Sequence, residues 1–124
     1  MKLTLKHAFA AIILVLGFVT PVVAGPLEDA DTAIKRRDYA TALRLIRPLA
    51  EQGDANAQYN LGVFYDNGLG VPQDRVRAHM WLNLAAMQGR ESAATFRDLV
   101  ARLMTPAQIA EAQKLAREWK LKPE

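Results

Sequence analysis

The loop between Gly68 and Asp74 contains a G-x-G pair directly ahead of a predicted helix, a pattern that cradles phosphate in nucleotide-binding proteins. Such a site needs a preceding strand and a third glycine, whereas the segment before Gly68 has helical periodicity and the third position is Gln73. Pro72 also removes a backbone amide that would face the phosphate. We therefore expect a turn between two helices, with Gly68 ending the first and Asp74 capping the second.

The chain offers few other reactive side chains. After residue 24 it has one histidine, His79, and one serine, Ser92, and it has no cysteine at all. His79 has no acid at ligand spacing, which argues against a metal site and predicts a histidine on a helix surface. Ser92 lacks the glycines of a nucleophile elbow and is predicted to start a helix. Glu111 and Glu118 share a helix face, where solvated charge is commoner than an acid–base pair. We predict no catalytic residue, metal or cofactor.

Two tryptophans, Trp81 and Trp119, are candidate platforms for a ligand. Both fall in apolar stripes at helical spacing, which favours packing in a core. Apolar residues recur at this spacing throughout the chain after Pro26, and no alternating strand pattern occurs. The predicted fold class is therefore all-α. We expect six short helices, covering about 27–37, 39–52, 55–67, 74–88, 92–104 and 106–121.

The helices that end near Gly53 and Gly89 belong to an internal repeat with a period of 36 residues. Pairs at this offset share residue types: Asp38 and Asp74, Ala42 and Ala78, Ala50 and Ala86, Gly53 and Gly89, Ala57 and Ala93. A period of this length is typical of stacked helical hairpins that form an α-solenoid. The register fails after Ala93, so the last helices are expected to cap the array.

Residues 54–89 resemble one complete Sel1-like repeat, a relative of the tetratricopeptide repeat. The residues that carry the resemblance are Ala57, Leu61, Gly62, Tyr65, Gly68, Gly70, Val71, Asp74, Ala78, Trp81, Ala85, Ala86 and Gly89. Residues 38–53 resemble the second half of a preceding repeat, with Leu45 where tryptophan is usual. The resemblance implies an α–α superhelix that binds a protein or peptide partner, commonly in the bacterial envelope. Capping helices are expected over about 92–121.

The first 24 residues have the pattern of a secretory signal. Lys2 and Lys6 precede the apolar run Ala8–Val19, and Val22 and Ala24 provide small residues before a cleavage site. The run is shorter than the roughly 20 residues that cross a bilayer. Cleavage would leave residues 25–124 with 14 basic and 13 acidic residues, a charge of +1, so the basic pI is weak support for nucleic-acid binding. The alternative is an uncleaved anchor. We expect an exported, periplasmic protein, or one that is secreted or anchored to the inner membrane.

One face of the third predicted helix is the candidate partner-binding surface. Asn56, Tyr59, Val63 and Asp66 are spaced by three or four residues and therefore neighbour one another. In solenoids of paired helices the first helix of each pair lines the concave side. Packing of Tyr59 and Val63 against the adjacent hairpin is the alternative.

These features favour an exported, non-catalytic protein-interaction module without a cofactor. Two alternatives are open. The first is an envelope enzyme that hydrolyses β-lactams, as suggested by cysteine-rich relatives, although this chain has no cysteine. The second is a membrane-anchored structural subunit with an uncleaved N-terminal helix. Self-association is a further open possibility.

Overall fold

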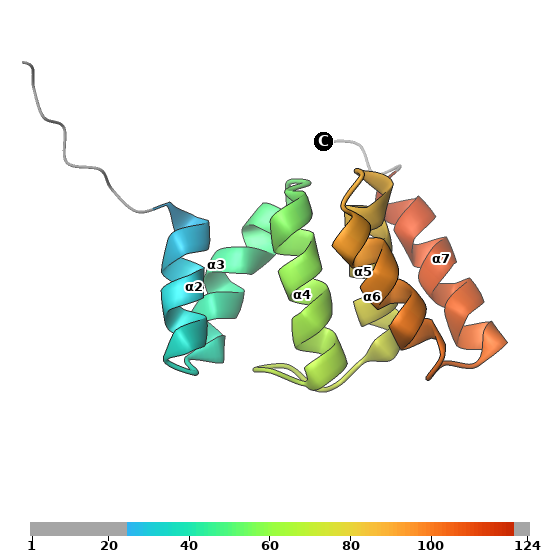
Figure 1. Cartoon of the computed structure of the whole chain (residues 1–124), viewed down its shortest axis with the longest axis horizontal. Helices are drawn as coiled ribbons and strands as arrows, with labels where there is room; N and C mark the ends of the chain where they lie inside the picture. Colours follow the sequence, from blue (N-terminus) through green and yellow to red (C-terminus); the bar gives the residue numbers. More distant parts are fainter. Residues whose placement is uncertain (1–24, 121–124) are drawn as a thin grey trace, which may run out of the picture.

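The computed structural model describes residues 25–120, which fold into an array of α-helices (Figure 1). Their bounds are α2 Pro26–Lys35, α3 Tyr39–Glu51, α4 Ala55–Asn67, α5 Arg75–Met87, α6 Glu91–Ala101 and α7 Pro106–Lys120. Within the described range there is no β-strand, and the all-α prediction is confirmed. The expected signal segment, residues 1–24, lies outside this range. None of the described helices is long and apolar enough to cross a membrane.

Three aspartates start three of the helices by capping them. The side chains of Asp38, Asp54 and Asp74 each accept a hydrogen bond from the backbone amide three residues later, at 3.2, 2.8 and 3.0 Å respectively. A carboxylate in this position satisfies an amide that has no partner within the helix. The predicted cap at Asp74 is confirmed, and Asp38, its partner in the repeat, caps α3 in the same way.

The start of α7 is a reciprocal capping box, as its sequence predicts. Thr105 Oγ1 accepts from the Gln108 amide at 3.2 Å, and Gln108 Oε1 accepts from the Thr105 amide at 2.9 Å. The start of α6 differs from the prediction. Arg90, in an extended conformation, occupies the N-cap position without a side-chain capping bond, and Ser92 instead accepts from Arg90 Nε at 3.0 Å.

The 36-residue period has a direct structural counterpart. Asp38 and Asp74 cap α3 and α5, while Gly53 and Gly89 follow the ends of the same two helices with φ of +101° and +93°. The paired alanines Ala42 and Ala78 are both fully buried. The two segments therefore begin, end and pack in equivalent ways.

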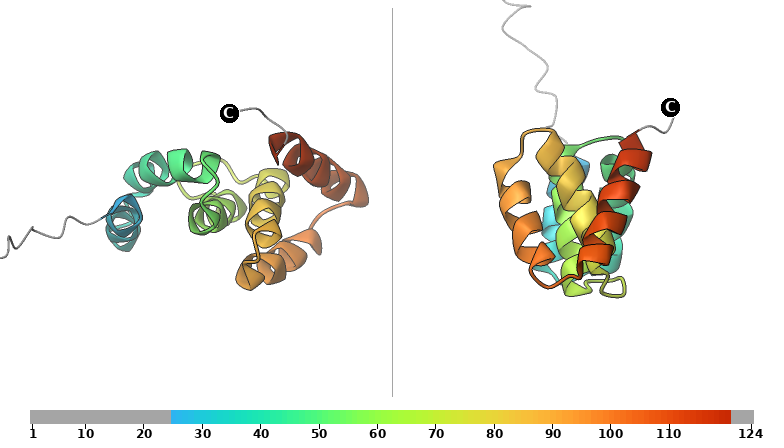
Figure 2. Two further views of the ribbon diagram at one scale, coloured as in Figure 1. Left: turned by 90° about the horizontal axis from the view of Figure 1, so that it is seen from above. Right: turned by 90° about the vertical axis from the view of Figure 1, so that its right-hand side faces the viewer.

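The helices pack mostly with their neighbours in sequence, except at the C-terminal end. α2 packs on α3, α3 on α4, and α4 on α5, whereas α6 and α7 both pack on α5. Figure 2 shows α6 and α7 on opposite sides of α5. α5 is thus enclosed by three helices, which explains why its sequence carries apolar residues around most of its circumference.

Small residues let the helix axes approach closely. A side chain at Gly62 of α4 would place its Cβ 2.7 Å from Leu82 Cγ and 3.2 Å from the backbone oxygen of Ala78, both on α5. Larger side chains fill the remaining space. Those most completely buried are Ile46, Leu61, Leu82 and Val100.

A buried glutamine connects the two repeats. Gln58 is 2% exposed and donates through Nε2 to the backbone oxygen of Ala50, at 3.2 Å. Its Oε1 accepts from Gln88 Nε2 at 2.8 Å. One amide side chain therefore joins the end of α3, the start of α4 and the residue that follows α5.

Candidate functional site

The glycine loop forms the turn between α4 and α5, as predicted. Gly68 and Gly70 have φ of +67° and +69°, a left-handed backbone that glycine adopts without strain. The Leu69 amide donates to Phe64 O and the Asp74 amide to Tyr65 O, both at 2.9 Å. These two amides are therefore already paired with the C-terminal end of α4.

The loop also contacts the preceding hairpin. A Cβ at Gly70 would lie 2.8 Å from Leu43 Cδ1 and 3.1 Å from Tyr39 Cβ, on α3. Glycine is thus required at this position for both its conformation and its close contact. The structure supports a packing role for the loop.

His79 does not lie on the helix surface, and that prediction is wrong. The side chain is 3% exposed, and its Nδ1 has no hydrogen-bond partner within residues 25–120. Burial lowers the pKa of His79 below its usual value, and the nearby positive charge of Arg97 lowers it further. The reason for the error is the enclosure of α5, which leaves this helix almost no solvated face.

The other candidate reactive groups remain at the surface. Ser92 and Glu111 are exposed, and Glu118 Oε1 lies 3.8 Å from Lys114 Nζ in an ion pair along α7. Among the described residues no three histidine or acidic side chains gather into a group that could hold a metal ion. Ser92 thus lies on α6 and the two glutamates on α7, with all three side chains at the surface.

The predicted binding face on α4 is partly covered by the start of α6. The Tyr59 ring lies 6.3 Å from the Phe96 ring, and the Arg90 guanidinium lies 4.2 Å from the Tyr59 centroid. Arg90 also donates to Asn56 Oδ1. Val63, like Tyr59, is half-buried. This neighbourhood matches the packing alternative, although the assignment of a partner to this face stays a prediction.

Asp66, at the other end of this face, interacts with Gln73 of the glycine loop and with Arg75 at the start of α5. Its carboxylate lies 4.0 Å from Arg75 Nε, and its backbone oxygen accepts from Gln73 Nε2 at 2.7 Å. This face of α4 therefore contacts the start of α6 at one end and the start of α5 at the other.

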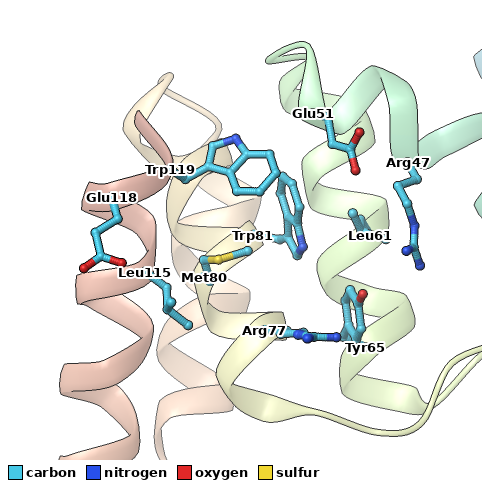
Figure 3. Close-up of a pocket in the computed structure, with 10 residues that line it drawn as sticks. All are labelled: Arg47, Glu51, Leu61, Tyr65, Arg77, Met80, Trp81, Leu115, Glu118 and Trp119. Atoms are coloured by element: carbon cyan, nitrogen blue, oxygen red, sulfur yellow. The ribbon is translucent and has the colours of Figure 1, made fainter. Parts of the chain in front are cut away.

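A pocket of about 390 Å³ opens elsewhere, between α3, α4, α5 and α7 (Figure 3). It is lined by Arg47, Glu51, Leu61, Tyr65, Arg77, Met80, Trp81, Leu115, Glu118 and Trp119. Three of the four helices are the second members of their pairs. Figure 2 shows α3 and α7 toward one side of the array, with α2 and α6 toward the other. This pocket is therefore a different surface from the concave side that first helices are expected to line.

The floor of the pocket is aromatic and aliphatic. Trp81, 5% exposed, meets Trp119 edge to face, with ring centroids 4.8 Å apart and an interplanar angle of 64°. Tyr65 and Leu61, contributed by α4, are also buried. Trp119 is half-buried. Trp81 packs in the core as predicted, and together with Trp119 it also forms part of the pocket floor.

Charged side chains surround this floor. Arg47 and Glu51 come from α3, Arg77 from α5 and Glu118 from α7, and all four are exposed. The Arg77 guanidinium lies 5.7 Å from the centroid of the Tyr65 ring. A pocket with an apolar floor and a polar rim has the composition of a ligand or peptide site.

Sequence reasoning did not find this rim. Arg47 reads as part of a solvated basic helix face, and Arg77 lies 30 residues further along the chain. Helical periodicity predicts which residues of one helix share a face, but the bend of the chain decides which faces of different helices meet. The two tryptophans, already candidates for a ligand platform, were the only feature of the sequence that pointed to this pocket.

The fold and the pocket together define a class of protein: a short α-solenoid of stacked helical hairpins with a recess on one side. The sequence places it in a family within this class. Residues 31–54 and 55–89 each match the family model of the Sel1 repeat. The chain therefore contains two tandem Sel1 repeats, and such repeats generally mediate protein–protein interactions. No curated protein matches the chain significantly.

Proposed function

We propose that this protein is an exported, non-catalytic interaction module that docks a segment of another protein into the pocket between α3, α4, α5 and α7. The observation that carries the proposal is the indole pair, in which the half-buried Trp119 lies against the buried Trp81 at the wall of the pocket. Tryptophan and arginine are the residues most enriched at the energetic centres of interfaces. Both types line this pocket.

The size of the pocket agrees with a peptide-sized contact. A volume of about 390 Å³ lies at the small end of the range for ligand sites, about 300–1,000 Å³. It accommodates one or two side chains of a partner rather than a folded domain. Neighbouring surfaces of the array would then supply further contacts.

Photo-crosslinking in the native cell tests the proposal. A photoreactive benzoylphenylalanine replaces Glu51 at the rim, and a matched substitution replaces Arg44, which is exposed on the same helix but does not line the pocket. We expect an adduct of defined mass at position 51, none at position 44, and loss of the adduct when Trp119→Ala is added. Equal adducts at both positions, or adducts insensitive to Trp119→Ala, would contradict docking in the pocket.

Export is the second part of the proposal, and the residues that support it lie outside the described range. The basic start, apolar run and small-residue end of residues 1–24 support secretion, with the bacterial periplasm as the destination. N-terminal sequencing of the protein isolated from its native host tests this. Gly25 as the first residue supports cleavage and export, whereas an intact Met1 supports the anchored alternative.

A further inference from the structure

One end of the pocket carries two arginines on either side of Tyr65. In Figure 3 the side chain of Arg47 extends from α3 toward the Tyr65 end of the pocket, where Arg77 lies against the tyrosine ring. No acidic side chain among residues 25–120 forms an ion pair with Arg47. Arg77 approaches Asp74, with 3.7 Å between Nε and Oδ2, at an exposed position where such a pair contributes little. This end is therefore available to an anion.

The other end of the pocket carries two glutamates in a different situation. Glu118 pairs with Lys114 along α7, and Figure 3 shows its carboxylate directed away from the indole rings. Glu51 lies one turn along α3 from Arg47, at the end away from Tyr65. The charges of the rim are thus separated into an arginine end and a glutamate end, with the indole pair between them.

We propose that the docked segment carries an acidic side chain next to a large apolar side chain. The apolar group packs on Trp81 and Trp119, and the neighbouring carboxylate binds Arg47 and Arg77. This inference rests on the proposed function and adds the chemistry of the partner to it. Guanidinium groups suit a carboxylate because their planar donors match its two oxygens. Contact with the Tyr65 ring restricts Arg77 before the ligand arrives, so less side-chain freedom is lost on binding.

The position of the tryptophans gives the test a direct readout. The chain has two tryptophans, and both line the pocket, so intrinsic fluorescence reports its occupancy. The probes are three peptides that are acetylated and amidated, so that only their side chains differ in charge: GEFEG, GQFQG and GKFKG. Titration at low ionic strength is expected to give the tightest binding for GEFEG and the weakest for GKFKG. The advantage of GEFEG should shrink as salt is added, because the rim is exposed.

Variants of the rim locate the charge that is recognised. Arg47→Ala and Arg77→Ala are each expected to weaken GEFEG binding by about 1.5- to fivefold, the range for exposed charge pairs. Arg44→Ala is the matched control and leaves the affinity unchanged, since Arg44 lies on the same helix outside the pocket. Glu51→Gln is expected to act in the opposite direction and strengthen GEFEG binding, because it removes a like charge. Circular dichroism of each variant verifies the fold.

The outcomes separate this inference from the proposed function. If GKFKG binds as tightly as GEFEG, or if Arg47→Ala and Arg44→Ala behave alike, the acidic partner is excluded while docking in the pocket stands. If no peptide alters the fluorescence at millimolar concentration, the inference is overturned as well. The crosslinking experiment then decides the proposed function independently, since it requires no assumption about partner charge.

Discussion

Gly62 shows how strongly one position can control the contact between two helices. An added side chain would meet Leu82 Cγ at 2.7 Å, and Leu82 is fully buried and cannot move aside into solvent. Overpacking of this kind costs about 1–3 kcal/mol. We therefore expect Gly62→Val to lower the free energy of unfolding by about 2 kcal/mol in urea denaturation. Asn60→Ala, on the same helix, is the control and should change it by less than about 0.7 kcal/mol.

His79 makes the stability of the protein sensitive to mild acid. Burial lowers the pKa of His79 below its ordinary value of 6.5 in the folded state, and the charge of Arg97 on α6 lowers it further, while Asp98 on the same helix partly offsets the shift. The unfolded chain, with the ordinary pKa, binds the proton more readily. The free energy of unfolding should therefore be highest above pH 6.5 and fall as the pH drops below it. Urea denaturation between pH 7.5 and 5 measures this.

The variant His79→Leu isolates the contribution of the histidine. The variant loses the titrating group and fills the buried site with an apolar side chain. Its free energy of unfolding should therefore depend less on pH over the same interval. If the two proteins lose stability in parallel, the pH dependence arises elsewhere.

The sequence alone predicts the structural roles of some residues but not of others. The turn glycines and helix caps are predictable because their interactions are made with residues three to nine positions away, as with Asp74 and Tyr65. The burial of His79 and the placement of Arg47 and Arg77 at the same pocket depend instead on how separate helices pack. Neither can be derived from spacing along the chain.

Between elements, the Gln58 amide is the polar connection that holds the repeats in register. Replacing it by leucine would leave the backbone oxygen of Ala50 and the Nε2 group of Gln88 without this partner. The Ala50 oxygen keeps the Gly53 amide as a donor and the Gln88 side chain is exposed, so the loss is the net contribution of two hydrogen bonds, about 0.5–1.5 kcal/mol each. Gln58→Leu should therefore lower the free energy of unfolding by about 1–3 kcal/mol. Gln113→Leu on the exposed face of α7 is the matched control. A loss of similar size in both would show that the hydrogen bonds are unimportant.

Most helix starts follow from local signals, but the start of α6 does not. The sequence predicts a start at Ser92, whereas the helix begins at Glu91 behind an extended Arg90. Arg90 holds this conformation through contacts with Asn56 and the Tyr59 ring of α4. A tertiary contact thus replaces the local cap. The same contact covers part of the α4 face predicted to bind a partner.

At the scale of the whole molecule, α7 completes the array and one wall of the pocket. It packs only on α5 among its major contacts, and its Trp119 covers Trp81. We expect a chain that stops after Met104 to melt at a lower temperature, by several degrees. Its Trp81 emission should also shift to the red as water reaches the indole. Full-length Trp119→Phe, which also retains Trp81 alone, is the reference, and an unshifted emission would show that α7 does not shield the core.

The enclosure of α5 also determines the order in which the helices exchange their amide hydrogens with solvent. α5 contacts α4, α6 and α7, whereas α2 contacts chiefly α3. Amides exchange with deuterated water when their segment opens, and segments with few buried neighbours open at the lowest cost. Deuterium should therefore enter α2 first and α5 last. In this chain the most persistent helix is the one that carries both His79 and Trp81, so the pocket would keep its indole floor while the N-terminal hairpin opens and closes.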